Sequence, residues 1–429
     1  MGVVMKKPVK PLQVNPIKLS APMGATLAFL GIERCMPLMH GGQGCTSFSK
    51  VYFTRHFSEP IAVQTTAVTD VTAILDGGDY NIVEAIKNIT TKVDPALIGL
   101  FTTGLTETKG DDVRGVASQV DFPLAYVNTP DYEGGLECGW GLAAKAVIEQ
   151  LVAPTEAIDD DRVLLLPHVS LTSLEVEKIK DFIEAFGFDV LALPDISNSL
   201  DGHLGEKQSA ISDGGITVEA IRSLAESSLV ISVGTSMASA AEALTRKNPF
   251  VRHHHFSHLS GLEASDSFAA LLLQESGRSE PPPVVERWRK RLQDAMLDSH
   301  FSLGQTDFLV CAEPDHLAGL CQSLQEAGGR VRVALSTVNS PQLNSVVADV
   351  VQVGDLEDAE LLHDRYHLVV GNGHCESLAH RLHKGLLLRG YPNWEHVGHQ
   401  LRSDVLYEGG CNLLFEAANV ATDLREHNR

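Results

Sequence analysis

Residues 163–193 read VLLLPHVSLTSLEVEKIKDFIEAFGFDVLAL, which places two apolar runs on either side of an amphipathic stretch. The runs VLLL and VLAL are short and uninterrupted, as expected for strands that are buried on both faces. Between them, Thr172 and Glu175 form a candidate capping box at the start of a helix over Thr172–Phe186. Gly187 can end that helix. A strand, a helix and a strand in succession predict a parallel pair covered by the helix.

The same alternation continues on both sides of this stretch. Apolar runs that read as further strands are Leu97–Phe101, Leu124–Val127, Leu229–Val233, Phe308–Cys311, Val331–Leu335 and Leu368–Val370. Helical patterns separate these runs, so the sequence predicts an α/β fold with parallel sheets flanked by helices.

Two segments look like domain boundaries. Ala153–Asp161 carries a proline and three consecutive aspartates, and Glu275–Val284 reads ESGRSEPPPV, whose prolines cannot continue a helix. For a chain of 429 residues, three domains are also the expected number. The predicted domains are residues 1–155, 156–285 and 286–429.

The charge balance excludes some classes of partner. The chain has 34 basic and 55 acidic residues and a net charge of −21, so it lacks the basic footprint that nucleic acids or anionic membranes require. Its first 16 residues contain no long apolar stretch, which argues against a secretory signal. The seven cysteines are few, odd in number and scattered, without C-x-x-C spacing. We therefore expect reduced thiols in a cytoplasmic protein.

The segment HGGQGCTSF, residues 40–48, surrounds one cysteine with three glycines. Glycine lets the backbone come close to whatever contacts Cys45. The thiolate could hold a metal cluster in a tight loop, or Cys45 could be a buried structural residue beside a glycine turn. The residues alone favour the structural interpretation, because lone cysteines are common in protein cores.

Three other segments carry weaker signals. FTTGLTETKGDD, residues 101–112, follows a strand and could bind a ligand, but a plain strand-to-helix turn is favoured. Gly371 and Gly373 resemble the start of a dinucleotide fingerprint, yet Glu376 occupies the third glycine position. In RHHHFSHLSG, residues 252–261, adjacent histidines cannot all face one ion, so we expect a solvated loop.

A family resemblance emerges from longer stretches. Residues 15–60, NPIKLSAPMGATLAFLGIERCMPLMHGGQGCTSFSKVYFTRHFSEP, resemble the amino-terminal signature of the nitrogenase β-subunit family. That family contains the β subunit of the molybdenum-iron protein and a scaffold paralogue. The resemblance continues through FTTGLTETKGDD, YVNTPDYEGG, LPDISNSLDGHL, DAMLDSHF, VGDLED and LVVGNGH, and so covers nearly the whole chain. It implies three Rossmann-like domains.

The cysteines distinguish the branches of that family. A catalytic β subunit supplies three cysteines to the large cluster that it shares with its α partner. The matching positions here are Ser20, Cys45 and Gly104, and a nearby serine position falls at Gly135. One thiolate of three remains. This pattern is similar to the scaffold branch, in which the partner NifE supplies three cysteines to an interfacial [4Fe-4S] cluster. The resemblance therefore implies that Cys45 is the fourth ligand, whereas Cys35 and Cys138 are read as structural.

The resemblance also implies a role and partners. The expected role is that of a cofactor-assembly scaffold rather than an enzyme, in a heterotetramer of two such chains with two NifE chains. A precursor of the iron-molybdenum cofactor would arrive from NifB and be held mainly by NifE. It would mature with the nitrogenase iron protein and pass to the apo molybdenum-iron protein.

Four alternatives remain open from the sequence. A catalytic nitrogenase β subunit is disfavoured by Ser20, Gly104 and Gly135, which offer no thiolates. The vanadium-system counterpart of the scaffold is equally compatible with these residues. The other two are a nucleotide-dependent dehydrogenase and a purely structural subunit without metal.

Overall fold

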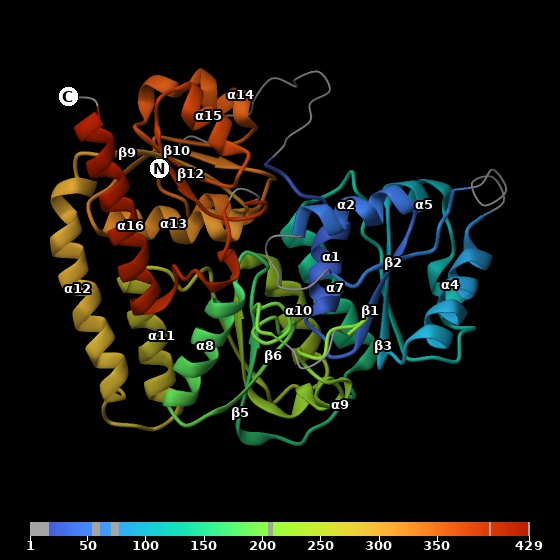
Figure 1. The fold of residues 1–429 in the computed structure, drawn as a ribbon. Coiled ribbons are helices and arrows are strands. Elements are labelled where there is room, and N and C mark those ends of the chain that lie inside the picture. The colour runs from blue at the N-terminus through green and yellow to red at the C-terminus, as the bar shows by residue number, and fades with distance from the viewer. Residues whose placement is uncertain (1–16, 54–60, 70–76, 205–208, 394–395, 428–429) are drawn as a thin grey trace.

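The computed structural model describes residues 17–53, 61–69, 77–204, 209–393 and 396–427. Residues 1–16, considered above for a signal, and 54–60, the end of the matched block, lie outside them. In the described part of the chain, three parallel sheets are flanked by helices (Figure 1). This confirms the α/β fold class. None of the helices in these ranges is long and apolar enough to cross a membrane.

The first sheet has the strand order β2-β1-β3-β4, and all its pairs are parallel. Its strands are β1 (Cys35–His40), β2 (Gln64–Thr65), β3 (Leu97–Thr102) and β4 (Leu124–Val127). Its helices are α1 (Ala21–Leu30), α2 (Gln43–Phe53), α4 (Asp79–Lys92), α5 (Gly104–Lys109), α6 (Val113–Ala117) and α7 (Leu136–Leu151). The helix α1 packs on the sheet through Phe29, whose ring lies 6.1 Å from that of Phe101. A side chain at Gly99 would collide with Phe29, so this close packing requires glycine.

The second sheet has the order β6-β5-β7-β8 and contains the strand–helix–strand unit quoted first. Its strands are β5 (Asp159–Leu166), β6 (Asp189–Ala192), β7 (Ser227–Val233) and β8 (Arg252–Phe256). Its helical segments are α8 (Ser173–Ala185), α9 (Val218–Arg222), η1 (Leu224–Glu226), η2 (Thr235–Met237), α10 (Ala238–Thr245) and α11 (Leu262–Glu275).

The capping box of α8 is confirmed. The Glu175 N–H donates to Thr172 Oγ1 at 3.2 Å, and the Thr172 N–H donates to Glu175 Oε2 at 2.8 Å. Gly187 follows the helix with φ +101°, a conformation that favours glycine.

The histidine run does not form the expected loop. Residues Arg252–Phe256 are the edge strand β8, paired in parallel with β7. His253 Nε2 and His255 Nδ1 lie 2.8 and 3.0 Å from the hydroxyl oxygen of Ser232. The expectation was wrong because an edge strand pairs on one side only, so it forms without the apolar pattern that identifies a buried strand.

The third sheet has the order β11-β10-β9-β12-β13, again all parallel. Its strands are β9 (Asp307–Ala312), β10 (Arg330–Ser336), β11 (Val350–Val353), β12 (Leu368–Gly371) and β13 (Gly385–Leu388). Its helical segments are α12 (Pro283–Leu303), α13 (Pro314–Glu326), η3 (Pro341–Asn344), α14 (Leu356–Leu361), η4 (His363–Arg365), α15 (Cys375–Arg381), η5 (His399–Leu401) and α16 (Leu406–His427). The proline run ends at the start of α12, where Pro282 is the N-cap.

Two buried carboxylates join the three sheets in series. Glu137 of α7 accepts the Asp315 N–H at 2.9 Å, at the start of α13. Asp315 in turn accepts the N–H groups of Thr235 and Ser236, which follow β7, at 2.8 and 3.0 Å. The largest apolar cluster also contains residues from all three sheets. The domain boundaries at 155/156 and 285/286 stay predictions.

Candidate functional site

The carboxyl edge of the first sheet gathers the positions that the family resemblance singles out. Because β1, β3 and β4 are parallel, the turns that follow them meet at one edge. Cys45 lies in the first turn of α2, Gly104 is the first residue of α5, and Gly135 is the N-cap of α7. Ser20 is the N-cap of α1. It lies near Gly135, because a Cβ built on Gly135 would be 3.5 Å from the carbonyl oxygen of Leu19, the residue before Ser20.

Cys45 is exposed, so the buried structural interpretation of this residue is wrong. Its backbone belongs to a regular helix that begins at Gln43, directly after the Gly41-Gly42 turn. Desolvation and the nearby Asp131 carboxylate raise the pKa of the thiol, so without a metal it is protonated at neutral pH. The Cys45 thiol is thus accessible at this edge to a group outside the chain.

Gly41 lets the turn before Cys45 lie against Thr103, which directly follows β3, the neighbour of β1 in the sheet. A Cβ at this position would lie 2.8 Å from both Cγ2 and Oγ1 of Thr103, so a larger residue would push the turn away from β3. At Gly44, in contrast, a Cβ would meet nothing within 4 Å. The close approach expected from the glycines is therefore made within the chain at Gly41, and the Gly44 side faces open space.

A buried network that the sequence did not reveal fixes the same turn. His40, the last residue of β1, has no exposed surface. Its Nε2 lies 2.9 Å from Asp111 Oδ2, and its Nδ1 lies 2.9 Å from Thr66 Oγ1. Its carbonyl oxygen accepts hydrogen bonds from Thr103 and Thr106 at 3.1 and 3.0 Å. Burial lowers the pKa of His40, so the neutral ring is favoured.

This network gives the segment FTTGLTETKGDD a structural purpose. It forms the expected strand-to-helix turn, with Thr103 as the N-cap of α5. Thr103, Thr106 and Asp111 hold His40, and through it the turn that leads to Cys45. Sequence reasoning singled out the segment, but not these contacts, because the partners are 63 to 71 residues apart in the chain.

The other matched positions supply no sulfur. A Cβ on Gly104 would lie 3.2 Å from the ring of exposed Tyr132, and one on Gly135 would lie 3.0 Å from Val338. Among the described residues, no group of three or more His, Cys, Asp or Glu side chains could hold a metal ion. Among the four matched positions, only Cys45 therefore offers a thiol.

Helix ends favour negative charge at this edge. The amino-terminal ends of α1, α2 and α7 all lie at the carboxyl edge of the first sheet, and each directs partial positive charge toward it. Such ends stabilise anions, including thiolates and anionic clusters.

The remaining cysteines divide into two groups. Five are buried: Cys35, Cys311, Cys321, Cys375 and Cys411. Cys138 is exposed in the first turn of α7, so burial in a core does not account for it, and its structural role stays a prediction. The glycine at 371 has a packing reason, because a Cβ there would lie 2.6 Å from the Cys375 sulfur.

Comparisons with known proteins agree with this geometry. The model of the family described as nitrogenase component 1 type oxidoreductase matches residues 20–422. The chain belongs to this family. It aligns with the iron-molybdenum cofactor biosynthesis protein NifN of Rippkaea orientalis at 40% identity, over 97% of this chain and 95% of that protein. NifN of a Nostoc species is 37% identical, over 99% and 96%. Within the nitrogenase component 1 family, the chain is thus a member of the NifN group.

Solved structures confirm the family fold. A structure of nitrogenase Cp1 at pH 6.5 matches with a TM-score of 0.93 and 27% identity, covering 99% of this chain and 96% of the other. A chain of nitrogenase Cp1 at pH 5 matches with a TM-score of 0.74 and 14% identity, which shows the shared fold alone.

Proposed function

We propose that this chain is a scaffold subunit for maturation of the nitrogenase iron-molybdenum cofactor, and that Cys45 ligates a [4Fe-4S] cluster shared with NifE. The names of its NifN relatives support the biosynthetic role. The observation that carries the cluster assignment is the exposure of Cys45 at an edge where no other matched position has a thiol. A [4Fe-4S] cluster takes four thiolates, so a partner must supply the other three.

The surface around Cys45 supports a subunit contact. Large apolar side chains are exposed on the same edge, including Phe48 at 66%, Tyr132 at 62% and Leu105 at 42%. Phe48 lies one turn after Cys45 on α2, and Leu105 follows Gly104 on α5. Exposed apolar groups beside a metal ligand favour a partner that covers both. We infer that NifE covers this edge.

The residues of this edge would hold the cluster in defined ways. When bound, the cluster would supply a one-electron redox centre between the subunits. Cys45 would contribute its thiolate, and iron binding must displace the proton that the raised pKa retains. The three helix ends would offset the negative charge of the thiolate-bound cluster. His40 and Asp111 would keep the turn before Cys45 in place.

The wider pathway is part of the same proposal. NifB would donate a precursor that NifE holds for the most part. The nitrogenase iron protein would assist the addition of molybdenum and homocitrate, and the apo molybdenum-iron protein would accept the product. In this scheme the chain assists assembly as a scaffold and need not carry out catalysis itself.

The catalytic β-subunit alternative requires three thiolates from this chain. Ser20, Gly104 and Gly135 do not provide them, and the described residues contain no multi-residue metal site. The vanadium-system counterpart remains a second form of the scaffold proposal, and the metal found in the matured cofactor distinguishes the two.

The test is co-purification with NifE, followed by iron quantitation and electron paramagnetic resonance of three complexes: wild type, Cys45→Ala and Cys138→Ala. Cys138 is the matched control, because its thiol is also exposed in the first turn of a helix at this edge. We expect the [4Fe-4S] signal in wild type and Cys138→Ala, and its loss or weakening in Cys45→Ala. Full iron and an unchanged signal in Cys45→Ala would refute the assignment. Dinitrogen reduction by the wild-type complex would instead favour the catalytic alternative.

A further inference from the structure

A pocket of about 170 Å³ lies between α8, α12 and α16, in a part of the molecule that the proposed function does not use. In Figure 1, α12 and α16 stand at the left, whereas α2 and α5 lie at the right. The pocket is lined by Lys178, Asp181, Phe182, Ala185, Val284, Val285, Trp288, Ser403, Val405, Leu406, Tyr407 and Glu408. We name it the α8–α12–α16 pocket.

The walls of the α8–α12–α16 pocket are aromatic and held in place. The Phe182 ring stacks on Phe268 with centroids 5.5 Å apart, and lies 6.1 Å from the Tyr407 ring. The Tyr407 hydroxyl donates to Asp266 at 2.7 Å, and Arg289 makes two hydrogen bonds of 2.8 Å to the same carboxylate. Side chains fixed in this way keep the space open for a guest.

The size of the pocket defines the size of its guest. An apolar cavity of roughly 150 Å³ in another protein binds benzene, so this volume suits a single six-membered ring with a short substituent. Filled with solvent, the same space would hold about six waters at ~30 Å³ each, beside walls that offer them few hydrogen bonds. Displacing such waters favours an apolar guest.

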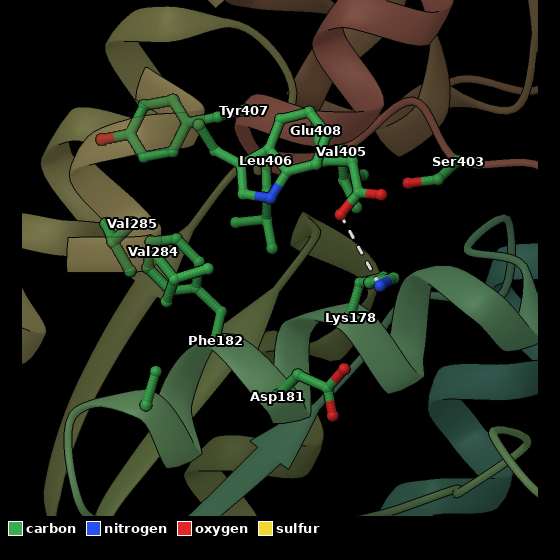
Figure 2. A pocket seen from close by; sticks show the side chains of 12 residues that line it. Lys178, Asp181, Phe182, Val284, Val285, Ser403, Val405, Leu406, Tyr407 and Glu408 are labelled. Atoms are coloured by element: carbon green, nitrogen blue, oxygen red, sulfur yellow. Dashed lines mark ion pairs between the residues drawn. The ribbon is translucent and has the colours of Figure 1, made fainter. Parts of the chain in front are cut away.

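The polar side of the pocket carries an excess of negative charge. Figure 2 shows Phe182, Val284 and Val285 on one side, with Lys178 and Glu408 on the other. Lys178 Nζ lies 3.6 Å from Glu408 Oε2, which pairs these two charges.

The second carboxylate of the pocket is uncompensated. Asp181 is exposed, lines the same pocket and has no ion-pair partner within the described ranges. Among the lining residues, Lys178 and Glu408 cancel each other, and the negative charge of Asp181 remains. A guest with a positive end would therefore be favoured, and one with a carboxylate would be opposed.

We propose that the α8–α12–α16 pocket binds a small organic cation, with one ring or a comparable apolar body among Phe182, Trp288 and Tyr407 and a protonated amine near Asp181. The faces of Phe182 and Tyr407 also attract a cation, whereas the Trp288 ring already has the Arg291 guanidinium 4.4 Å from its centroid. This site is independent of Cys45 and of the cluster, so the outcome of one test does not decide the other.

The experiment uses the NifE complex and three probes of one size: benzylamine, which is protonated at neutral pH, benzyl alcohol and benzoate. Binding is followed by fluorine NMR of the complex labelled with 5-fluorotryptophan, and the Trp288 resonance is assigned through Trp288→Phe. We expect saturable shifts of that resonance, with benzylamine bound about threefold tighter than benzyl alcohol and benzoate bound most weakly. The absence of saturable shifts, or equal binding of benzoate and benzylamine, would overturn the proposal.

Variants test the two parts of the site separately. Asp181→Asn should remove the preference for benzylamine and retain binding of benzyl alcohol. Glu184→Gln removes one carboxylate from the same helix outside the pocket lining, and should leave the preference unchanged. Ala185→Leu, which narrows the space, should weaken all three probes. An equal effect of Asp181→Asn and Glu184→Gln on benzylamine would contradict the charge argument.

Discussion

Asp111→Ala removes the support of the turn that presents Cys45. The Asp111 side chain is 3% exposed and that of His40 is fully buried. The Asp111 carboxylate contacts His40 Nε2 at 2.9 Å, accepts the Gly78 N–H at 3.2 Å and lies 3.2 Å from Lys109 Nζ. In the alanine variant, the buried His40 nitrogen and the Gly78 N–H lose this partner together.

The size of the effect follows from these two groups. A buried polar group left without its partner costs about 1–3 kcal/mol, so two such groups at the lower part of that range cost about 3 kcal/mol. Asp112→Ala is the matched control, since the next residue is also an aspartate but caps the short helix α6 through Gly115 at 2.9 Å. Loss of an exposed cap costs about 1 kcal/mol. The difference of about 2 kcal/mol corresponds to about 30-fold in an opening equilibrium.

Hydrogen exchange of the backbone amides in β1 and α2 measures this opening. We expect exchange about 30-fold faster in Asp111→Ala than in Asp112→Ala, and faster loss of cluster iron from the corresponding NifE complex although Cys45 is intact. Equal protection of β1 and α2 in the two variants would refute the argument that the contact between His40 and Asp111 holds the turn.

Three further predictions concern pH, a buried ion pair and the chain without its partner. Burial raises the pKa of Glu175 and Glu313 from 4.5 to about 8, so the stability that they contribute is lost as pH rises across that range. Burial lowers the pKa of His168 and His316 from 6.5 to about 3 and about 4, and their contribution is lost as pH falls below 6.5. Between pH 4.5 and 6.5 the gain from the two histidines offsets the loss from the two glutamates. Urea unfolding should therefore give maximal stability between pH 4.5 and 6.5, and a maximum above pH 8 would contradict this. Arg389→Ala, which leaves Asp404 buried without its cation, should cost about 3–5 kcal/mol in urea unfolding and Arg389→Lys less, and equal losses would argue against the paired geometry. Iron analysis of the chain purified without NifE should find far less than one [4Fe-4S] cluster per chain, and a stoichiometric cluster would show that it needs no partner ligands.

The sequence predicted the buried strands well because their signal is local. All eight apolar runs form strands in the structure: Leu97–Phe101, for example, lies in β3, and Leu368–Val370 lies in β12. An uninterrupted apolar run has few alternatives to a strand in the middle of a parallel sheet. Five strands in the described part of the chain were missed. β1 contains a proline and a histidine, β2 has two residues, and β8 is rich in histidine. β11 and β13 are mostly apolar, but they are four-residue strands at the two edges of the third sheet, too short to stand out in the sequence.

The candidate site was only partly predictable. The glycines identified the turn before Cys45, but not the exposure of the thiol, which depends on how α2 lies on the sheet. The contact of His40 with Asp111 spans 71 residues and follows from the pairing of β1 with β3, so no local pattern announces it. The exposure of Cys138 was not predictable for the same reason, because exposure is a property of the assembled fold.

Alkylation of Cys45 in the NifE complex tests the central claim most directly. Mass spectrometry would follow iodoacetamide modification of Cys45 before and after chelation of the iron, with chromatography to verify that the complex stays assembled. We predict that Cys45 is unreactive while iron is present and becomes reactive once iron is removed. Equal reactivity in the two states would contradict the claim that Cys45 is bound to the cluster, whether the thiol is always accessible or always covered by NifE.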